Sequence, residues 1–363
     1  MPEIKIEMLR KEFKEVVAVK DVSVTFRTGM VTCLLGPSGC GKTTLMRMIA
    51  GLEKPTSGSI YFDDVNITGL PPEKRNIGMV FQYPVVYRGM NVYKNIDLPL
   101  VEEGLTEVER KNRIEEIVDI LNLRDSLYLN VDQIDNSTRQ RVAVARAVAR
   151  RPQIILFDEP LTNVDVATKV QLKHALKKLT KQYQQTIIYV THDQTEAMTL
   201  ADEIALMNEG EIIQKDSPRK LYSNPNTIFG GWFLGNPGMN FIEARVEKTG
   251  EGTKILSELL KEPINVDKKI DQNEIIIGVR PEEIEIGLKE TEQMIECKVL
   301  RKSIVIGGQY LISAKINDKL FKVKVSSELG YMIRDKIWIR LPIDKVTFFG
   351  KNGSRIDLGD VYR

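Results

Sequence analysis

Apolar runs and amphipathic stretches alternate along the chain up to about Gly235. Ile154 to Phe157 and Thr186 to Thr191 are apolar and rich in β-branched residues, which favours buried strands. Between them, Lys169 to Gln182 is amphipathic and long enough for a helix. Strands that alternate with helices are typical of a parallel sheet covered by helices. The pattern predicts an α/β domain over residues 1–235.

Two further stretches predict helices without a strand between them. Glu107 to Leu121 and Arg139 to Arg150 have helical character, and they follow one another in the chain. This arrangement indicates a helical subdomain inserted into the α/β domain at about residues 87–150.

The pattern changes after Gly235-Asn236-Pro237-Gly238, a run of turn-forming residues. Beyond it, short strand-like runs separated by Gly and Asn/Asp turns predict a small all-β domain over residues 236–363. The expected strands are Phe241 to Val246, Glu274 to Val279, Gln293 to Leu300, Tyr310 to Ile316, Leu320 to Val325 and Lys336 to Leu341.

Composition limits the possible partners. The chain has 363 residues, more than one ordinary core accommodates, and its net charge of +2 gives no electrostatic case for nucleic acid. No apolar run is long enough to span a membrane and the first residues do not form a signal peptide, so we expect any membrane role to come through a partner protein. Cys33, Cys40 and Cys297 show no metal spacing and fit a reducing cytosol.

A phosphate-binding motif lies near the N-terminus. Residues 36–43 read Gly-Pro-Ser-Gly-Cys-Gly-Lys-Thr, which fits the pattern G-x-x-x-x-G-K-[ST]. The apolar run Val31 to Leu35 precedes the motif and the helix-compatible stretch Thr44 to Ala50 follows it. This context argues against a glycine-rich turn that matches by chance. We expect nucleotide contacts from Gly36, Pro37, Ser38, Gly39, Cys40, Gly41, Lys42, Thr43 and Thr44.

The residue types in and beyond the motif suit the binding and hydrolysis of ATP. Glycines let the backbone approach phosphate, and N–H groups at a helix N-terminus attract anions. Lys42 can reach the β- and γ-phosphates, and the Thr43 hydroxyl can ligate Mg²⁺. Asp158, at the end of the strand that begins at Ile154, is placed to hold Mg²⁺, and Glu159 can orient or deprotonate an attacking water. An acidic strand end that only faces solvent is the alternative, which the phosphate loop weakens.

With these motifs the chain resembles the ATPase subunit of an ATP-binding cassette importer. The resemblance implies that Gln82, in Phe81-Gln82, contacts Mg²⁺ or water near the interface with the membrane subunits. It implies that the loop Leu161-Thr162-Asn163-Val164-Asp165 crosses a dimer interface with Asp165, and that His192 in Thr191-His192-Asp193 contacts the γ-phosphate. Phe13 occupies the place of the aromatic residue that stacks on adenine, although a core phenylalanine is a competing interpretation.

The resemblance covers the whole chain. Thr191 to Met198, Met239-Asn240-Phe241 and Val279 to Glu282 are similar to segments of the maltose-type carbohydrate-uptake ATPases. The family implies an α/β P-loop NTPase domain with a helical subdomain, then an OB-like β domain that dimerises and can bind regulators. It also implies two transmembrane permease subunits, an extracellular solute-binding protein acting through them, and a position on the cytoplasmic face of the membrane. Polyamine, iron and anion importers share parts of this layout, and the ATPase subunit does not encode the solute.

One motif departs from the family. A loop with the sequence Leu-Ser-Gly-Gly-Gln, which presents a serine and glycine N–H groups to ATP on the opposite subunit, here reads Ile134-Asp135-Asn136-Ser137-Thr138. Asp135 would bring a carboxylate toward that phosphate. Two unit charges about 4 Å apart at an effective dielectric of about 20 repel by roughly 4 kcal/mol, and a helix N-terminus returns at most about 2 kcal/mol. Asp135, Asn136 and Ser137 are also good helix caps, so a helix can begin here without phosphate binding being restored.

Three hypotheses account for this combination. The first is an importer ATPase that works in a heterodimer with a second ATPase whose loop is intact. The second is a homodimeric importer ATPase with slow hydrolysis. The third is a regulatory cassette protein that binds ATP without transport, against which Glu159, Gln82 and the C-terminal β domain argue.

Overall fold

The computed structural model describes residues 2–162, 164–249, 252–305, 307–359 and 361–362. The chain forms two compact units, Met1–Arg219 and Lys220–Arg363. In the described residues, no helix is both long enough and apolar enough to cross a membrane.

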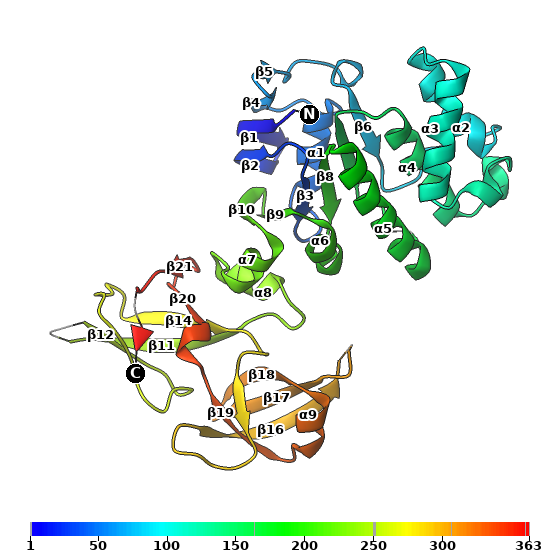
Figure 1. Ribbon diagram of the computed structural model, residues 1–363. Coiled ribbons are helices and arrows are strands. Elements are labelled where there is room, and N and C mark those ends of the chain that lie inside the picture. Colours follow the sequence, from blue (N-terminus) through cyan, green and yellow to red (C-terminus); the bar gives the residue numbers. More distant parts are fainter. Residues whose placement is uncertain (1, 163, 250–251, 306, 360, 363) are drawn as a thin grey trace. The chain divides into compact units, whose positions relative to one another are not determined.

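A largely parallel sheet is the centre of the first unit, with strand order β10-β9-β3-β8-β7-β6 (Figure 1). All its neighbouring strands run parallel except β10, which pairs antiparallel with β9. Every residue of β3, β7 and β8 is buried, as expected for strands covered on both faces. The strands are β3 Val31–Leu35, β6 Ile77–Val80, β7 Ile154–Asp158, β8 Thr186–Thr191, β9 Glu203–Asn208 and β10 Glu211–Asp216.

A second, antiparallel sheet of order β2-β1-β4-β5 lies in the same unit, and the apolar pattern of the sequence does not distinguish its strands from those of the parallel sheet. Its register shifts where β1 bulges, and Met8 in that bulge has a left-handed φ of 45°. Irregular strands of this kind blur the alternation of apolar residues on which sequence-based recognition depends. The strands are β1 Ile4–Phe13, β2 Val16–Phe26, β4 Ser57–Phe62 and β5 Val65–Asn66.

Helix α1 packs between these sheets. Its buried residues Leu45, Met46, Met48 and Ile49 share one apolar cluster with residues of both. The helices that follow β6 in the chain, α2 to α4, precede β7 with no strand among them, in a stretch that the structure describes completely. The helices of this unit are α1 Lys42–Ala50, α2 Val92–Glu102, α3 Glu107–Ile120, α4 Asn136–Ala149, α5 Val166–Tyr183 and α6 Gln194–Leu200.

The second unit contains two antiparallel sheets, of order β21-β20-β14-β11-β12-β13-β22 and β15-β19-β16-β17-β18. One apolar cluster joins residues of both, including Ile277 from the first and Ile312 from the second. The all-β prediction for this part of the chain is confirmed. The strands are β11 Asn240–Lys248, β12 Thr253–Leu256, β13 Ile264–Val266, β14 Glu274–Val279, β15 Glu285–Gly287, β16 Ile295–Ile304, β17 Tyr310–Ile316, β18 Lys319–Val325, β19 Lys336–Arg340, β20 Val346–Phe349, β21 Arg355–Ile356 and β22 Val361–Tyr362, with helix α9 Ser327–Met332.

The two units divide between Arg219 and Lys220, before the break at Gly235 that the sequence indicates. The segment between these points carries most of α7 Pro218–Ser223 and all of α8 Ile228–Phe233. Most of α7 and all of α8 therefore lie on the C-terminal side of the division, although their helical character gives no sign of it in the sequence.

A buried arginine after β14 accounts for this division. The Arg280 guanidinium donates hydrogen bonds to the carbonyl oxygens of Gly231 at 2.9 Å and Tyr222 at 2.7 Å, and to that of Leu234. It also stacks on the Tyr222 ring, 3.9 Å from the centroid. Burial lowers the pKa of Arg280, and the phenol beside it partly opposes that shift. Three carbonyl oxygens of the segment that contains α7 and α8 therefore accept hydrogen bonds from this buried charge, while Arg280 Nε has no partner among the described residues.

We predict that a fragment of residues 220–363 is more stable than one of residues 236–363, because the shorter one leaves the buried Arg280 charge without its carbonyl acceptors. The expected loss is about 3 kcal/mol or more in the free energy of unfolding, since hydrogen bonds to charged groups contribute roughly 1.5–3 kcal/mol each. Denaturant titration followed by circular dichroism measures it. Arg280→Met in the longer fragment is the control, and equal stability of the two fragments would contradict the interpretation.

Candidate functional site

The phosphate loop connects β3 to α1, as the motif requires. Gly41 has φ of 102°, and a Cβ there would lie 2.2 Å from the Ala18 carbonyl oxygen, so only glycine fits. Lys42 begins α1 and is only 4% exposed. Its ammonium donates to the carbonyl oxygens of Gly36 at 2.9 Å and Pro37 at 2.8 Å. The loop thus wraps around a buried cation.

The Cys40 thiol also lies beside this cation, with Sγ 3.7 Å from the Lys42 ammonium. Burial raises the pKa of Cys40, while the charge of Lys42 partly offsets the shift. The thiol therefore stays protonated near neutral pH and serves as a small side chain that fits the loop.

The carboxylate at the end of β7 contacts α1. Thr43 Oγ1 donates to Asp158 Oδ1 at 2.9 Å. Burial raises the pKa of Asp158, and the hydrogen bond from Thr43 is the largest of the effects that oppose this rise. A hydroxyl and a carboxylate are thus fixed side by side at the N-terminus of α1.

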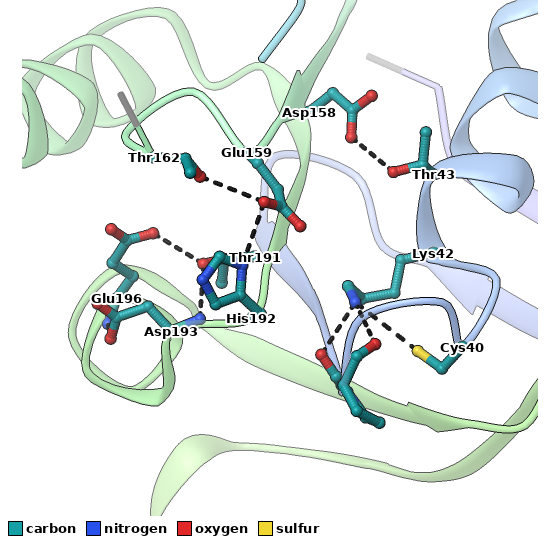
Figure 2. A network of polar contacts seen from close by, with 12 residues as sticks. Cys40, Lys42, Thr43, Asp158, Glu159, Thr162, Thr191, His192, Asp193 and Glu196 are labelled. Carbon is teal, nitrogen blue, oxygen red and sulfur yellow. Dashed lines mark hydrogen bonds and ion pairs between the residues drawn. The ribbon is translucent and has the colours of Figure 1, made fainter. Parts of the chain in front are cut away.

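Glu159 follows Asp158 and has a left-handed backbone, with φ of 45°. Its Oε2 accepts a hydrogen bond from Thr162 Oγ1 at 3.2 Å and lies 3.1 Å from His192 Nδ1 (Figure 2). An uncommon backbone conformation at a charged residue indicates a constrained position. The side chain is aimed at the histidine that follows the neighbouring strand β8.

A hydrogen-bonded ring of Thr191, Asp193 and Glu196 fixes the segment around His192, and no motif in the sequence identifies it. Thr191 Oγ1 donates to Glu196 Oε2 at 2.8 Å and accepts from the Asp193 N–H at 3.0 Å. Asp193 in turn caps α6 by accepting the Glu196 N–H at 3.2 Å. Tyr189 donates to the same buried Glu196 carboxylate at 3.1 Å, and burial raises the pKa of this tyrosine well above its usual value. Only the pattern of Asp three residues before Glu at a helix start hinted at this ring.

The remaining predicted residues lie at separate places. Phe13 ends β1 with 44% of its surface exposed, so it is not a core residue, and the Lys11 ammonium lies 4.7 Å from its ring centroid. Asp165 caps α5 by accepting the Thr168 N–H at 3.0 Å. Hydrogen bonds from Thr168 and Ser137 lower the pKa of Asp165. Asn163 lies outside the described residues, and the other histidine, His174, is exposed on α5.

Gln82 follows β6 in a loop that the helices hold in place. Asn95 of α2 is fully buried; its side chain accepts the Tyr87 N–H at 2.7 Å and donates to the Tyr87 carbonyl at 3.1 Å. Arg146 of α4 donates to the Val85 carbonyl and stacks on the Tyr87 ring, 4.2 Å from its centroid. These contacts are long-range in sequence, so residue patterns alone did not reveal them.

The substituted loop at residues 134–138 forms the start of α4. Asp135 is the N-cap, and its Oδ1 accepts the Thr138 N–H at 2.6 Å. The carboxylate therefore occupies an N–H donor at the helix N-terminus that an anionic ligand would otherwise use. Ser137 Oγ donates to Asp165 Oδ2 at 2.8 Å.

A phosphate loop between a buried strand and a helix, with carboxylates at the end of a neighbouring strand, defines a P-loop nucleotide-binding ATPase. Comparisons with known proteins refine this class. The ABC transporter family model matches residues 19–162, and the MalK OB fold domain model matches residues 235–284.

Two relatives and one solved structure are similar over long stretches. The trehalose/maltose import ATP-binding protein MalK of Thermococcus litoralis is 42% identical over 284 residues, 76% of this chain and 76% of that protein. The sn-glycerol-3-phosphate import ATP-binding protein UgpC of Psychromonas ingrahamii is 38% identical over 301 residues, 83% of this chain and 79% of that protein. A dimeric ATP-binding cassette in a post-hydrolysis state with ADP and Pi matches with a TM-score of 0.54 and 30% identity, over 60% of this chain and 99% of that one.

The chain belongs to the ABC transporter family and is an ATP-binding subunit whose ATPase activity is coupled to transport. Its C-terminal part includes the OB-fold domain typical of MalK. Subunits of this family dimerise and work with membrane permeases.

We predict that Lys42→Ala weakens ATP binding about 10- to 100-fold, because it removes charge-assisted hydrogen bonds contributing roughly 1.5–3 kcal/mol. Isothermal titration calorimetry with ATP measures the effect. Lys178→Ala, at an exposed position of α5, is the control and should bind like wild type. Equal affinity of the Lys42→Ala variant and wild type for ATP would show that Lys42 does not contribute to nucleotide binding.

Proposed function

We propose that this chain is the ATP-hydrolysing subunit of an importer for a sugar or a related solute. It would work at the cytoplasmic face of the membrane beneath two permease subunits, with an extracellular solute-binding protein delivering the solute. The import functions in the names of the relatives support this proposal. So does the exposed apolar surface of the loop after β6, where Tyr83, Val85 and Tyr87 are 71%, 54% and 45% exposed.

The observation that carries the proposal is the pairing of Glu159 with His192, 3.1 Å apart, beside Asp158, which ends β7 and accepts a hydrogen bond from Thr43 of α1. Glu159 is the candidate base that orients or deprotonates the attacking water, and His192 is the candidate contact for the γ-phosphate. Lys42 and the loop N–H groups would neutralise phosphate charge, and Phe13, exposed at the end of β1, would stack on adenine. Gln82 would complete the water site, and Asp165 would contribute across the dimer.

The donors at this edge fit Mg²⁺. The ion prefers oxygen ligands and usually binds through one or two carboxylates together with substrate phosphates. Thr43 and Asp158 supply a hydroxyl and a carboxylate, and Gln82 offers an amide oxygen. Within the described part of the chain, no group of three or more His, Cys, Asp or Glu residues gathers to hold a metal. This fits an ion shared with the nucleotide, where it would neutralise phosphate charge.

We predict that Glu159→Gln lowers ATP turnover by about 10²- to 10⁴-fold in the assembled transporter while ATP remains bound, because the amide cannot take the proton of the attacking water. Phosphate release and retention of labelled ATP measure the two effects. Thr162→Ala, which removes only the hydroxyl beside Glu159, should have a smaller effect. Undiminished turnover in Glu159→Gln would exclude this residue as the base.

The arrangement we propose is a heterodimer with a second ATPase that has an intact Leu-Ser-Gly-Gly-Gln loop. The nucleotide held by the partner would face the Asp135 carboxylate, whereas the nucleotide held by this chain would face a normal loop. The hydrogen bond from Thr138 N–H to Asp135 supports impaired binding, because it consumes a donor of the helix N-terminus. A penalty of roughly 2–4 kcal/mol on closing such a site corresponds to a rate lower by about thirty- to a thousand-fold.

We predict that replacing residues 134–138 with Leu-Ser-Gly-Gly-Gln raises turnover of the isolated subunit by about tenfold or more. Mixing the natural chain with an ATPase that carries this loop should raise turnover as well. Asp135→Ser keeps a helix cap but removes the charge. It therefore distinguishes the effect of charge repulsion on turnover from the effect of the missing glycines. If the natural chain alone hydrolyses ATP as fast as the version with the restored loop, the result favours a homodimer over a heterodimer. If no assembly hydrolyses ATP, it favours a regulatory cassette protein.

A further inference from the structure

The first two turns of α4 contact two loops that follow neighbouring strands. Ser137 and Gln140 are three residues apart in the chain, so their side chains lie on one face of the helix. Ser137 contacts the segment that follows β7, and Gln140 contacts the loop that follows β6. Since β6 and β7 are adjacent and parallel, these loops leave the same edge of the sheet. One helix face therefore connects the two.

Ser137 makes a reciprocal contact with the start of α5. Its hydroxyl donates to Asp165 Oδ2 at 2.8 Å and accepts the Asp165 N–H at 3.5 Å. At the other end of the same segment, Thr162 donates to Glu159, and the Thr162 N–H donates to the Glu159 carbonyl at 3.3 Å. Ser137 thus anchors the far end of the segment that begins with the candidate base.

Gln140 makes a corresponding contact with the loop of Gln82. Its side-chain amide donates to the carbonyl oxygen of Phe81, the residue before Gln82, at 3.2 Å. The side chain is 2% exposed, and its own carbonyl oxygen accepts no hydrogen bond from the described residues. A buried acceptor without a partner costs free energy, so stability alone does not favour a glutamine here.

A hollow of about 380 Å³ lies beside these contacts and is lined by Tyr83, Pro84, Asn136, Gln140 and Val164. Close packing, which would otherwise fix the distance between the two loops, is incomplete there. Ser137 and Gln140 therefore form the hydrogen bonds from the start of α4 to the two loops, and Arg146, further along α4, adds a contact with Val85 in the loop that follows β6.

We propose that Ser137 and Gln140 are positioning residues for ATP hydrolysis, which hold the loop of Gln82 and the segment after Glu159 in fixed relation to one another. Ser137 stands in the substituted loop, whose counterpart in relatives is expected to act on the opposite subunit. In this chain the position acts on its own site. Replacement of residues 134–138 with Leu-Ser-Gly-Gly-Gln also removes this hydroxyl, so the rise in turnover expected there is the net of this loss and of a larger gain from removing the Asp135 charge. This inference rests on the proposed function, in which Gln82 and Glu159 share one attacking water.

Ser137→Ala and Gln140→Met test the proposal in the assembled transporter. Each should lower kcat about tenfold with little change in KM for ATP, because the phosphate loop and Phe13 are untouched. Ser137→Thr keeps the hydroxyl and should restore turnover. Gln185→Met is the matched control. Gln185 is also buried, and its side-chain amide donates to the Pro152 carbonyl at 2.6 Å. Like that of Gln140, its side-chain oxygen has no partner among the described residues.

Hydrogen exchange on the nucleotide-free chain provides a readout that needs no hydrolysis. Exchange at the Asp165 and Thr168 amides should accelerate about tenfold in Ser137→Ala, and melting temperatures of Gln140→Met and Gln185→Met should stay near or above that of wild type. Unchanged exchange, or kcat unchanged in both positioning variants, would overturn the inference. The two possible failures can be distinguished. If the proposed function is wrong, turnover is insensitive to Glu159→Gln. If only the positioning inference is wrong, turnover depends on Glu159 but not on Ser137 or Gln140.

Discussion

The complete burial of β3, β7 and β8 is the constraint on which the site depends. Strands covered on both faces cannot carry charged side chains along their length, because an unpaired charge in the interior is too costly. The charged groups of the site are therefore confined to the carboxyl ends of these strands, where the backbone leaves the sheet. The phosphate loop follows β3, Asp158 ends β7 with Glu159 directly after it, and His192 follows β8. Their proximity is a consequence of strand order β3-β8-β7.

Much of this could be predicted because the signals are local. The strands at Val31, Glu274 and Tyr310 begin and end where the apolar pattern places them, and the glycines around Lys42 have a direct physical reason. The antiparallel sheet of β1, β2, β4 and β5 was missed because its bulges disturb the alternation of side chains. The all-β character of the C-terminal part was recognisable from its short strand-like runs and turn residues, and its OB-like fold was implied by the family resemblance. The place of α7 and α8 depends instead on Arg280, far away in the sequence.

The candidate site divides in the same way. Lys42, Thr43, Asp158, Glu159 and His192 stand in contiguous motifs, and the structure brings these five together (Figure 2). The sequence could not indicate how these residues are held in place, because the supporting contacts join separate elements. They are the hydrogen bonds of Glu196 with Thr191, of Asn95 with Tyr87, and of Ser137 with Asp165. For Asp135 the sequence predicts both a helix cap and repulsion of a phosphate on the opposite subunit, and the hydrogen bond from Thr138 confirms the cap. The structure adds that its carboxylate accepts the Thr138 N–H, so the two roles involve the same atoms.

The hydrogen bonds among Thr191, Asp193 and Glu196 determine how the side chain of His192 can move, and therefore on which time scale. The residues on either side of the histidine are tied together through the Thr191 hydroxyl, and α6 begins directly after them, while the imidazole itself is about half exposed. Because this backbone has little freedom, the imidazole of His192 can change hydrogen-bond partners only by rotation about its side-chain torsions. Exposed side chains rotate within picoseconds to nanoseconds, whereas enzymes typically turn over about 1–10³ times per second. The contact between His192 and Glu159 can therefore form and break many times within the duration of one turnover.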